Sequence, residues 1–186
     1  MTSSPSSLPP IIVVMGVAGS GKSSVGAALA ARHGWTFLEG DDLHPPANVA
    51  RMASGLPLSD ADREEWLATI ARRIAEADRS GTGLVVACSA LKRRYRDQLS
   101  AASGRVVYLF LSGDKPTVVE RMSRRAGHFM PLSLIDSQFD ALEPPQPDER
   151  VLTLPITLNP DQMLEEADRQ LATLQVAGLR QGEATP

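Results

Sequence analysis

The chain has 186 residues, of which 42% are hydrophobic and 22% are charged, and its formal net charge is −3. This length and composition predict a globular chain with a sizeable core and exclude a largely disordered one. The slightly acidic balance and the lack of a long Lys/Arg run argue against nucleic acid as a partner, because phosphate backbones require a basic stripe. Small-molecule partners are favoured.

Cysteine usage and the N-terminal segment indicate the compartment. Cys88 is the single cysteine, so no intramolecular disulfide can form, and a buried thiol suits a reducing cytosol. The segment MTSSPSSLPP lacks a basic region, and the apolar run behind it is too short for a signal peptide or a membrane span. We therefore expect a cytoplasmic protein without membrane contact, with flexible ends at 1–9 and 178–186.

Short apolar runs alternate with helical patterns along the whole chain. Strands are expected at Ile11–Met15, Thr36–Leu38, Gly83–Cys88, Val106–Leu111 and, more weakly, Val151–Leu158, and helices at 22–32, 60–79, 92–102, 115–125 and 161–176. This order predicts one α/β domain spanning residues 1–186, a five-stranded parallel sheet flanked by helices. The runs LVVAC and VVYLFL are continuously apolar, which is typical of strands in the middle of such a sheet.

The first expected strand runs into a glycine-rich loop. GVAGSGKS, Gly16 to Ser23, fits G-x-x-x-x-G-K-[ST] between a buried strand and a helix, the context of a phosphate-binding P-loop. Lys22 is expected to bridge the β- and γ-phosphates of ATP, and the Ser23 hydroxyl to hold Mg²⁺. The expected nucleotide-binding residues here are Gly16, Val17, Ala18, Gly19, Ser20, Gly21, Lys22, Ser23 and Ser24.

A P-loop alone leaves switch GTPases, motor ATPases and small-molecule kinases open. The base-reading motif N-K-x-D is absent, and the D-x-x-G at Asp78–Gly81 falls at a helix end. The third strand ends in VVACSALK, with Ser89 and Lys92 where a motor ATPase carries an acidic pair. Hydroxyl and ammonium groups beside the phosphates suit the holding of an acceptor better than the hydrolysis of ATP, which favours a kinase.

Carboxylates follow the second expected strand, in the stretch EGDDLHP. The carboxyl end of a strand beside the P-loop strand faces the ligand crevice of such sheets. Asp41 is expected to orient the acceptor hydroxyl, to take its proton and to touch Mg²⁺, with Asp42 as the alternative for this role and an Asx turn as the alternative for Asp41. His44 is expected to meet a substrate hydroxyl, although a lone histidine is often structural.

The third strand leads into CSALKRRYRDQL, which is expected to deliver Ser89, Lys92 and Arg96 into the same crevice. Lys92 and Arg96 are four residues apart and would share one helix face. Two cations beside a phosphate site indicate a carboxylate on the substrate. The alternative is an ordinary solvated basic face.

A basic stretch interrupted by Gly127 and Pro131 predicts a small lid at about 124–140. Arg124 is expected to stabilise the charge of the moving phosphoryl group, with Arg121 as the alternative. Either arginine could instead pair with a carboxylate on the body. His128 lies in the same stretch.

Taken together, seven segments resemble the gluconate kinases (gluconokinases), P-loop kinases related to shikimate and adenylate kinases. They are GVAGSGKS, GDDLHP, MASGLPLSDADREEWL, CSALKRRYRD, RRAGHFMP, SQFDALEPP and DER, in the order of that family across roughly residues 11–151. The resemblance implies a three-layer P-loop kinase fold, transfer of the ATP γ-phosphate to the 6-hydroxyl of D-gluconate, and a homodimer.

The resemblance also implies roles for the matched positions. These are Lys22 and Ser23 for phosphate and metal, Asp41 and His44 for substrate hydroxyls, Lys92 and Arg96 near the substrate, Arg124 and His128 on the lid, and Gln138 at the substrate, where a capping or core amide is an equal alternative. Two other readings stay open at this point: a kinase for shikimate or a nucleoside monophosphate, and a nucleotide-dependent binding module without transfer activity.

Overall fold

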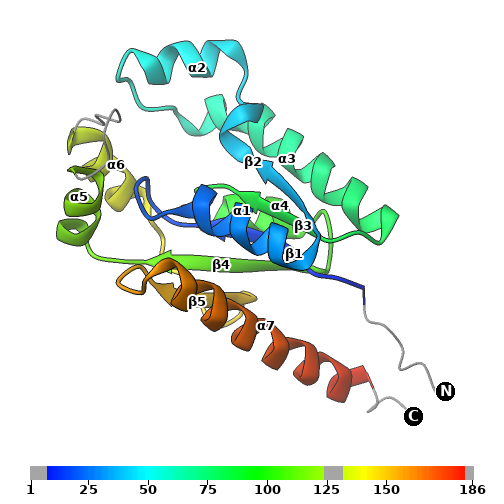
Figure 1. Cartoon of the computed structure of the whole chain (residues 1–186). Coiled ribbons are helices and arrows are strands. Elements are labelled where there is room, and N and C mark those ends of the chain that lie inside the picture. Colours follow the sequence, from blue (N-terminus) through cyan, green and yellow to red (C-terminus); the bar gives the residue numbers. More distant parts are fainter. Residues whose placement is uncertain (1–7, 124–131, 183–186) are drawn as a thin grey trace.

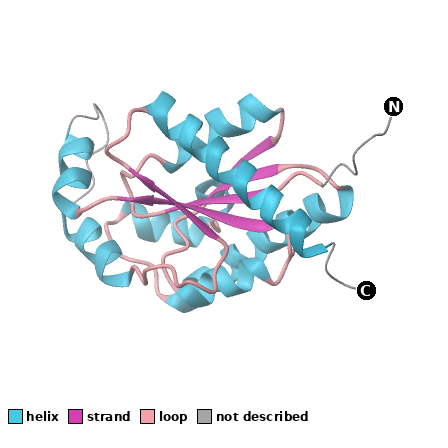
Figure 2. Ribbon diagram, turned by 90° about the horizontal axis from the view of Figure 1, so that it is seen from below, coloured by secondary structure: helices cyan, strands magenta, loops and turns pink. Residues whose placement is uncertain are grey.

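The computed structural model describes residues 8–123 and 132–182. Its centre is a five-stranded parallel sheet in the order β2-β3-β1-β4-β5, with helices on both faces (Figure 2). The strands are β1 Ile11–Met15, β2 Thr36–Glu39, β3 Leu84–Ala87, β4 Val106–Ser112 and β5 Val151–Pro155. Because β3 and β4 lie on either side of β1, the prediction that the two continuously apolar runs occupy the middle of the sheet is confirmed.

The helices follow the predicted alternation with additions. They are α1 Lys22–His33, the 3₁₀ turn η1 Gly40–Leu43, α2 Pro46–Ala53, α3 Asp60–Ser80, α4 Arg93–Ser100, α5 Lys115–Ser123, α6 Leu132–Ala141 and α7 Pro160–Gly182. The sequence did not predict η1 and α2. Pro46 begins α2 at a position where the missing N–H is not needed, so a residue that usually breaks helices starts one here. α7 ends six residues later than predicted.

Alternation along β1 divides the interior into two cores. Ile12 and Val14 pack on the side of α1 and α7, whereas Ile11, Val13 and Met15 pack on the side of α3 and α4. All five side chains are fully buried, as a central parallel strand requires. The sheet is therefore held rigidly from both faces.

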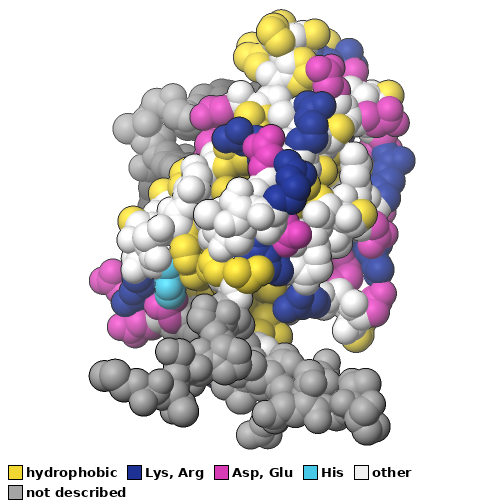
Figure 3. All heavy atoms as spheres, turned by 90° about the vertical axis from the view of Figure 1, so that its right-hand side faces the viewer, with side chains coloured by type: hydrophobic (Ala, Val, Ile, Leu, Met, Phe, Trp, Pro, Cys, Tyr) yellow, Lys and Arg dark blue, Asp and Glu magenta, His cyan; other side chains and the backbone are white. Residues whose placement is uncertain are grey.

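The parallel strands bring their carboxyl ends to one edge of the sheet. Figure 1 places α5 and α6 beyond this edge and α2 above it, while the start of β1 and the end of α7 lie at the opposite end of the molecule. Figure 3 views that opposite end, where basic and acidic side chains are interspersed without a basic stripe. None of the helices in the described part of the chain is long and apolar enough to span a membrane.

Candidate active site

The P-loop between β1 and α1 adopts backbone angles that require glycine. Gly16, Gly19 and Gly21 have φ angles of +139°, +80° and +100°. A Cβ atom on Gly16 would lie 2.8 Å from the Leu111 carbonyl oxygen, and one on Gly19 would lie 2.5 Å from Cγ of Met122. The loop is therefore a cradle of bare backbone, and its N–H groups can approach a phosphate closely.

Polar groups gather where this loop enters α1. Lys22 Nζ donates a hydrogen bond to the Val17 carbonyl at 3.1 Å, so its ammonium lies over the loop. Ser23 and Ser24 are exposed in the first turn of α1, where the helix dipole favours anions. The Ser20 hydroxyl is buried, and no group in the described residues bonds to it. This arrangement fits a nucleoside triphosphate and a Mg²⁺ ion, with the Ser23 hydroxyl as one ligand that could hold the ion.

Gln138 on α6 reaches the P-loop. Its Oε1 accepts a hydrogen bond from the Ala18 N–H at 2.6 Å, across 120 residues of sequence. The sequence assigned Gln138 to the substrate side, whereas the structure places its amide on the nucleotide loop.

A cavity of about 280 Å³ adjoins the P-loop on the side of α1 and α7. It is lined by Gly19, Ser20, Gly21, Ser24, Val25, Ala28, Arg121, Pro160, Met163 and Leu164. Arg121 enters it from α5 and donates a hydrogen bond to the Ile156 carbonyl at 2.7 Å. Sequence reasoning did not predict this cavity, because it combines segments from α1, α5 and α7 that share no local motif.

Asp41 lies on η1, the turn that follows β2 at the same edge of the sheet. A Cβ atom on Gly40 would lie 2.3 Å from the Ala87 carbonyl oxygen, so only glycine lets η1 lie against the end of β3. The Trp66 indole N–H donates to the Gly40 carbonyl at 2.7 Å and fixes the turn from below. The Asp41 side chain is 75% exposed at this edge, as expected for a carboxylate that meets a ligand.

His44 is buried beneath the same turn. Its ring stacks on Trp66 with centroids 4.2 Å apart, and its side chain is only 4% exposed. Nε2 lies 4.0 Å from a carboxylate oxygen of Asp41, while Nδ1 has no hydrogen-bond partner among the described residues. Burial, with a smaller effect of the Arg63 charge, lowers the pKa of His44 to about 4. The imidazole is therefore neutral at pH 7.

Lys92 is held by an aspartate that sequence reasoning did not assign to the site. Its Nζ lies 2.9 and 3.0 Å from the two carboxylate oxygens of Asp60, which also contacts Arg94 and the Tyr95 hydroxyl. Asp60 is the first residue of the long helix α3. The cap is Ser59, which forms a capping box with Asp62, so the Asp60 carboxylate is directed to α4 instead.

The prediction that Arg96 shares a substrate-facing surface with Lys92 is wrong. Helix α4 begins at Arg93, and Lys92 precedes it with extended backbone angles, so the helical spacing of four residues does not apply. The Arg96 side chain is 1% exposed and donates to Glu149 and to the carbonyls of Ala90 and Leu91. It supports the loop from inside rather than meeting the substrate.

The P-loop and the loop after β3 are directly bonded to each other. Gly16 N–H donates to the Ser89 carbonyl at 3.3 Å, and Cys88 N–H donates to the Val14 carbonyl at 3.0 Å. Cys88 is buried as expected, and burial raises the pKa of its thiol to about 12, so it remains protonated.

Two expected site residues, Arg124 and His128, lie outside the described residues, as does the first part of the expected lid; the rest of that lid is α6. Within 8–123 and 132–182 no group of three or more His, Cys, Asp or Glu side chains is arranged to hold a metal.

Comparison with known proteins identifies the family. A family model described as an AAA domain matches residues 11–145. A gluconokinase of Gluconobacter oxydans is 47% identical over 161 residues, which cover 87% of this chain and 90% of that protein. The chain belongs to the gluconokinase family. A gluconokinase crystal structure from Sinorhizobium meliloti, 45% identical, superposes with a TM-score of 0.87 over 94% of this chain and 98% of that one.

A second gluconokinase, the thermosensitive enzyme of Escherichia coli, is 48% identical over 143 residues, covering 74% of each chain. The resemblance in seven sequence segments and the predicted P-loop kinase fold are thus both confirmed. These matches cover between 74% and 94% of this chain.

Proposed function

We propose that this chain transfers the γ-phosphoryl group of ATP to the 6-hydroxyl of D-gluconate. The observation that carries the proposal is the hydrogen bond from Gly16 N–H to the Ser89 carbonyl, because it joins a P-loop to a second loop bearing Ser89 and Lys92. Membership of the gluconokinase family supports gluconate as the acceptor. A nucleotide-binding module without transfer activity would not depend on Lys92.

On the donor side, the P-loop N–H groups and Lys22 hold the β- and γ-phosphates, and Ser23 and Asp41 face the metal. Mg²⁺, when bound, draws negative charge from the phosphate oxygens and aligns them for transfer. The cavity lined by Ala28, Met163 and Leu164 receives the base of the nucleotide, since it is apolar and adjoins the loop.

On the acceptor side, Asp41 accepts the proton of the 6-hydroxyl as its oxygen forms a bond to phosphorus and ADP leaves. Neutral His44 binds a sugar hydroxyl through a ring nitrogen, because an uncharged imidazole both donates and accepts. Lys92 pairs with the gluconate carboxylate, sharing its charge with Asp60. Ser89, on the same loop as Lys92, contacts the substrate.

Five further assignments belong to the same proposal. Arg124 stabilises the charge on the phosphoryl group in transit, and His128 and Gln138 complete the binding of the two substrates. The protein works as a homodimer in the cytoplasm.

A coupled assay of ADP release tests the proposal directly. Purified protein with ATP and Mg²⁺ is offered D-gluconate, related sugar acids, shikimate and nucleoside monophosphates in turn. We expect ADP release and a phosphorylated product with D-gluconate, and turnover with the others at least about tenfold slower. Turnover with shikimate or a nucleoside monophosphate but not with gluconate would overturn the acceptor assignment.

A further inference from the structure

We propose that Glu149 is a positioning residue for the acceptor loop, residues 88–92, and that it acts through Arg96. The proposal rests on the function given above, in which this loop carries Ser89 and Lys92 to the substrate. Glu149 contacts neither ATP nor gluconate. Its effect is on where the backbone of the acceptor loop lies.

Arg96 connects Glu149 to the acceptor loop. Its Nη1 donates to the carbonyl oxygens of Ala90 and Leu91, both at 3.1 Å, while Nη2 donates to Glu149 Oε1 at 3.0 Å and Nε donates to the other carboxylate oxygen. One planar guanidinium therefore fixes two successive carbonyls of the loop and is itself fixed by a two-pronged carboxylate. A lysine has no such fork and cannot reproduce this geometry.

The acceptor loop needs external support at this point. Ala90 has a φ of +42°, the one positive φ on a residue other than glycine in the described chain. Such a conformation is disfavoured for a side chain with a Cβ and persists where surrounding contacts hold it. The turn at Ala90 redirects the chain from β3 into α4, so it decides where Ser89 and Lys92 point.

Glu149 is built into the structure as an ionised group. Its side chain is 5% exposed, and Oε1 also accepts from the Gln146 N–H at 2.8 Å. Burial alone would raise its pKa, but the hydrogen bonds from Arg96 and Gln146 lower it below the ordinary value. The carboxylate thus stays charged and paired with Arg96 at neutral pH.

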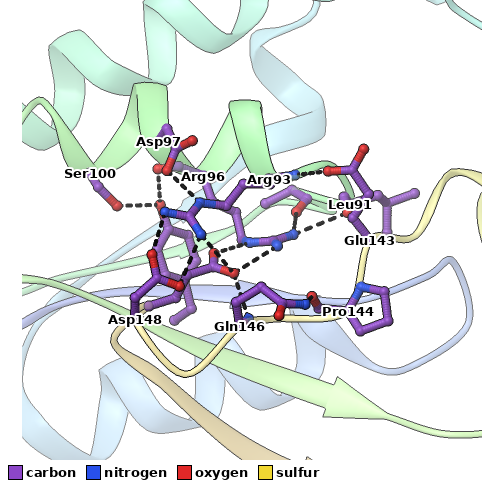
Figure 4. Close-up of polar contacts among 12 residues, drawn as sticks. Leu91, Arg93, Arg96, Asp97, Ser100, Glu143, Pro144, Gln146 and Asp148 are labelled. Atoms are coloured by element: carbon purple, nitrogen blue, oxygen red, sulfur yellow. Dashed lines mark hydrogen bonds and ion pairs between the residues drawn. The ribbon is translucent and has the colours of Figure 1, made fainter.

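A second contact fastens the same segment to the acceptor loop. Glu143 N–H donates to the Leu91 carbonyl at 2.9 Å, and the Glu143 carboxylate accepts from the Arg93 N–H at the start of α4. Figure 4 shows the segment with Glu143, Pro144, Gln146 and Asp148 passing along Arg96, with Glu143 beside Leu91. Residues 143–149 directly follow α6, whose Gln138 holds the P-loop, so one stretch of chain supports both substrate loops.

A positioning role and a purely structural role of Glu149 predict different effects of mutation. A buried ion pair can often be replaced by apolar side chains without loss of stability, whereas removal of one partner leaves an uncompensated charge. Replacing both Arg96 and Glu149 therefore separates the two roles: folding stability can recover, but the Ala90 carbonyl loses the Arg96 donor and the Leu91 carbonyl keeps only the Glu143 N–H.

The experiment compares wild type with Glu149→Gln, the double variant Arg96→Met/Glu149→Leu, and the control Asp148→Asn. Asp148 is the adjacent carboxylate and pairs with the half-exposed Arg93 rather than with Arg96. Gluconate KM, ATP KM, kcat and Tm are measured for each protein. Hydrogen exchange of peptides covering residues 88–93 is measured without ligands.

We expect Glu149→Gln and the double variant to lower kcat/KM for gluconate about 10- to 100-fold, mainly through KM, with ATP KM changed less than about twofold. Exchange in residues 88–93 should accelerate in both, and Tm should be closer to wild type in the double variant. Asp148→Asn should match wild type. If Glu149→Gln does not fold, the measurements on the double variant test the proposal.

Recovery of both Tm and gluconate KM in the double variant would overturn the proposal, as would unchanged exchange in residues 88–93. An equal rise of both KM values would also contradict it. Wild type without gluconate-dependent ADP release would instead refute the proposed function, and the exchange measurement would still decide whether Glu149 orders the acceptor loop.

Discussion

Lys92 and Asp60 form an ion pair across the mouth of the acceptor site, with the ammonium nitrogen 2.9 and 3.0 Å from the two carboxylate oxygens. The pair joins the first turn of α3 to the residue that precedes α4. Because Arg94 also contacts this carboxylate, the three charges together leave one net positive charge for an anionic substrate.

Lys92→Ala is expected to raise gluconate KM about 30-fold, since a hydrogen bond to a charged group contributes about 2 kcal/mol. ATP KM should change much less. Steady-state kinetics with each substrate varied in turn measure both. The matched control is Arg94→Ala, which removes an exposed partner of the same carboxylate and should change gluconate KM less than about threefold. Equal effects of the two variants would argue against a direct contact between Lys92 and the substrate.

Asp41→Asn is expected to lower kcat by about 10²- to 10⁴-fold with a smaller rise in gluconate KM, because the amide cannot accept the hydroxyl proton. Asp42→Asn on the same turn is the control and should retain most of its activity. Rate measurements at saturating gluconate separate the two parameters. A change confined to KM would make Asp41 a residue that holds the substrate rather than its general base.

His44 should make folding stability depend on pH. Its pKa is about 4 in the folded protein and near 6.5 in the unfolded chain, so between these values only the unfolded chain binds the proton. The contribution of His44 to stability is therefore full above pH 6.5 and is lost as pH falls towards 4, by at most about 3 kcal/mol. Urea unfolding at pH 7, 5.5 and 4.5 measures it.

The comparison protein for that measurement is His44→Phe, which keeps a ring against Trp66 but has no proton to bind. The difference in pH dependence between wild type and His44→Phe isolates this histidine from the carboxylates present in both. Parallel curves for the two proteins would show that His44 is freely protonated in the folded state.

The cavity beside the P-loop can be tested by filling it. Ala28 lines the cavity, and its neighbour Ala27 is exposed on the same helix. Ala28→Phe is expected to raise ATP KM at least about tenfold and to leave gluconate KM nearly unchanged, because the ring would occupy the space of the nucleotide base. Ala27→Phe should behave as wild type. If Ala28→Phe binds ATP normally, the base must lie elsewhere.

The features predicted correctly from the sequence are those formed by residues close together along the chain. The strands and the long helices were found because their apolar periodicities are strong, and the P-loop because its glycines, Lys22 and Ser23 are contiguous. The short helix α2 was missed because it has only eight residues and begins at a proline, a residue that usually breaks helices. Ends of elements were off by a few residues, as at α7.

Partners distant in sequence were not predictable in the same way. Asp60 lies 32 residues from Lys92, and Glu149 lies 53 residues from Arg96. Residue types and spacing identify which side chains carry charge, but the fold decides which charges meet. The wrong prediction for Arg96 arose because the helix was expected to begin at Lys92, whereas α4 begins one residue later, at Arg93. Lys92 therefore lies outside the helix, and the two side chains do not share a helix face.

The hydrogen bond between Gly16 and Ser89 also limits how freely this scaffold can be redesigned. A change of backbone at Ser89 itself, made to admit a different sugar acid, would pull on the first glycine of the nucleotide loop, whereas Ala90 and Leu91 are held by Arg96 instead. Under the proposed function, acceptor preference and ATP affinity are therefore coupled at Ser89, and variant libraries that change this residue should be selected for both at once.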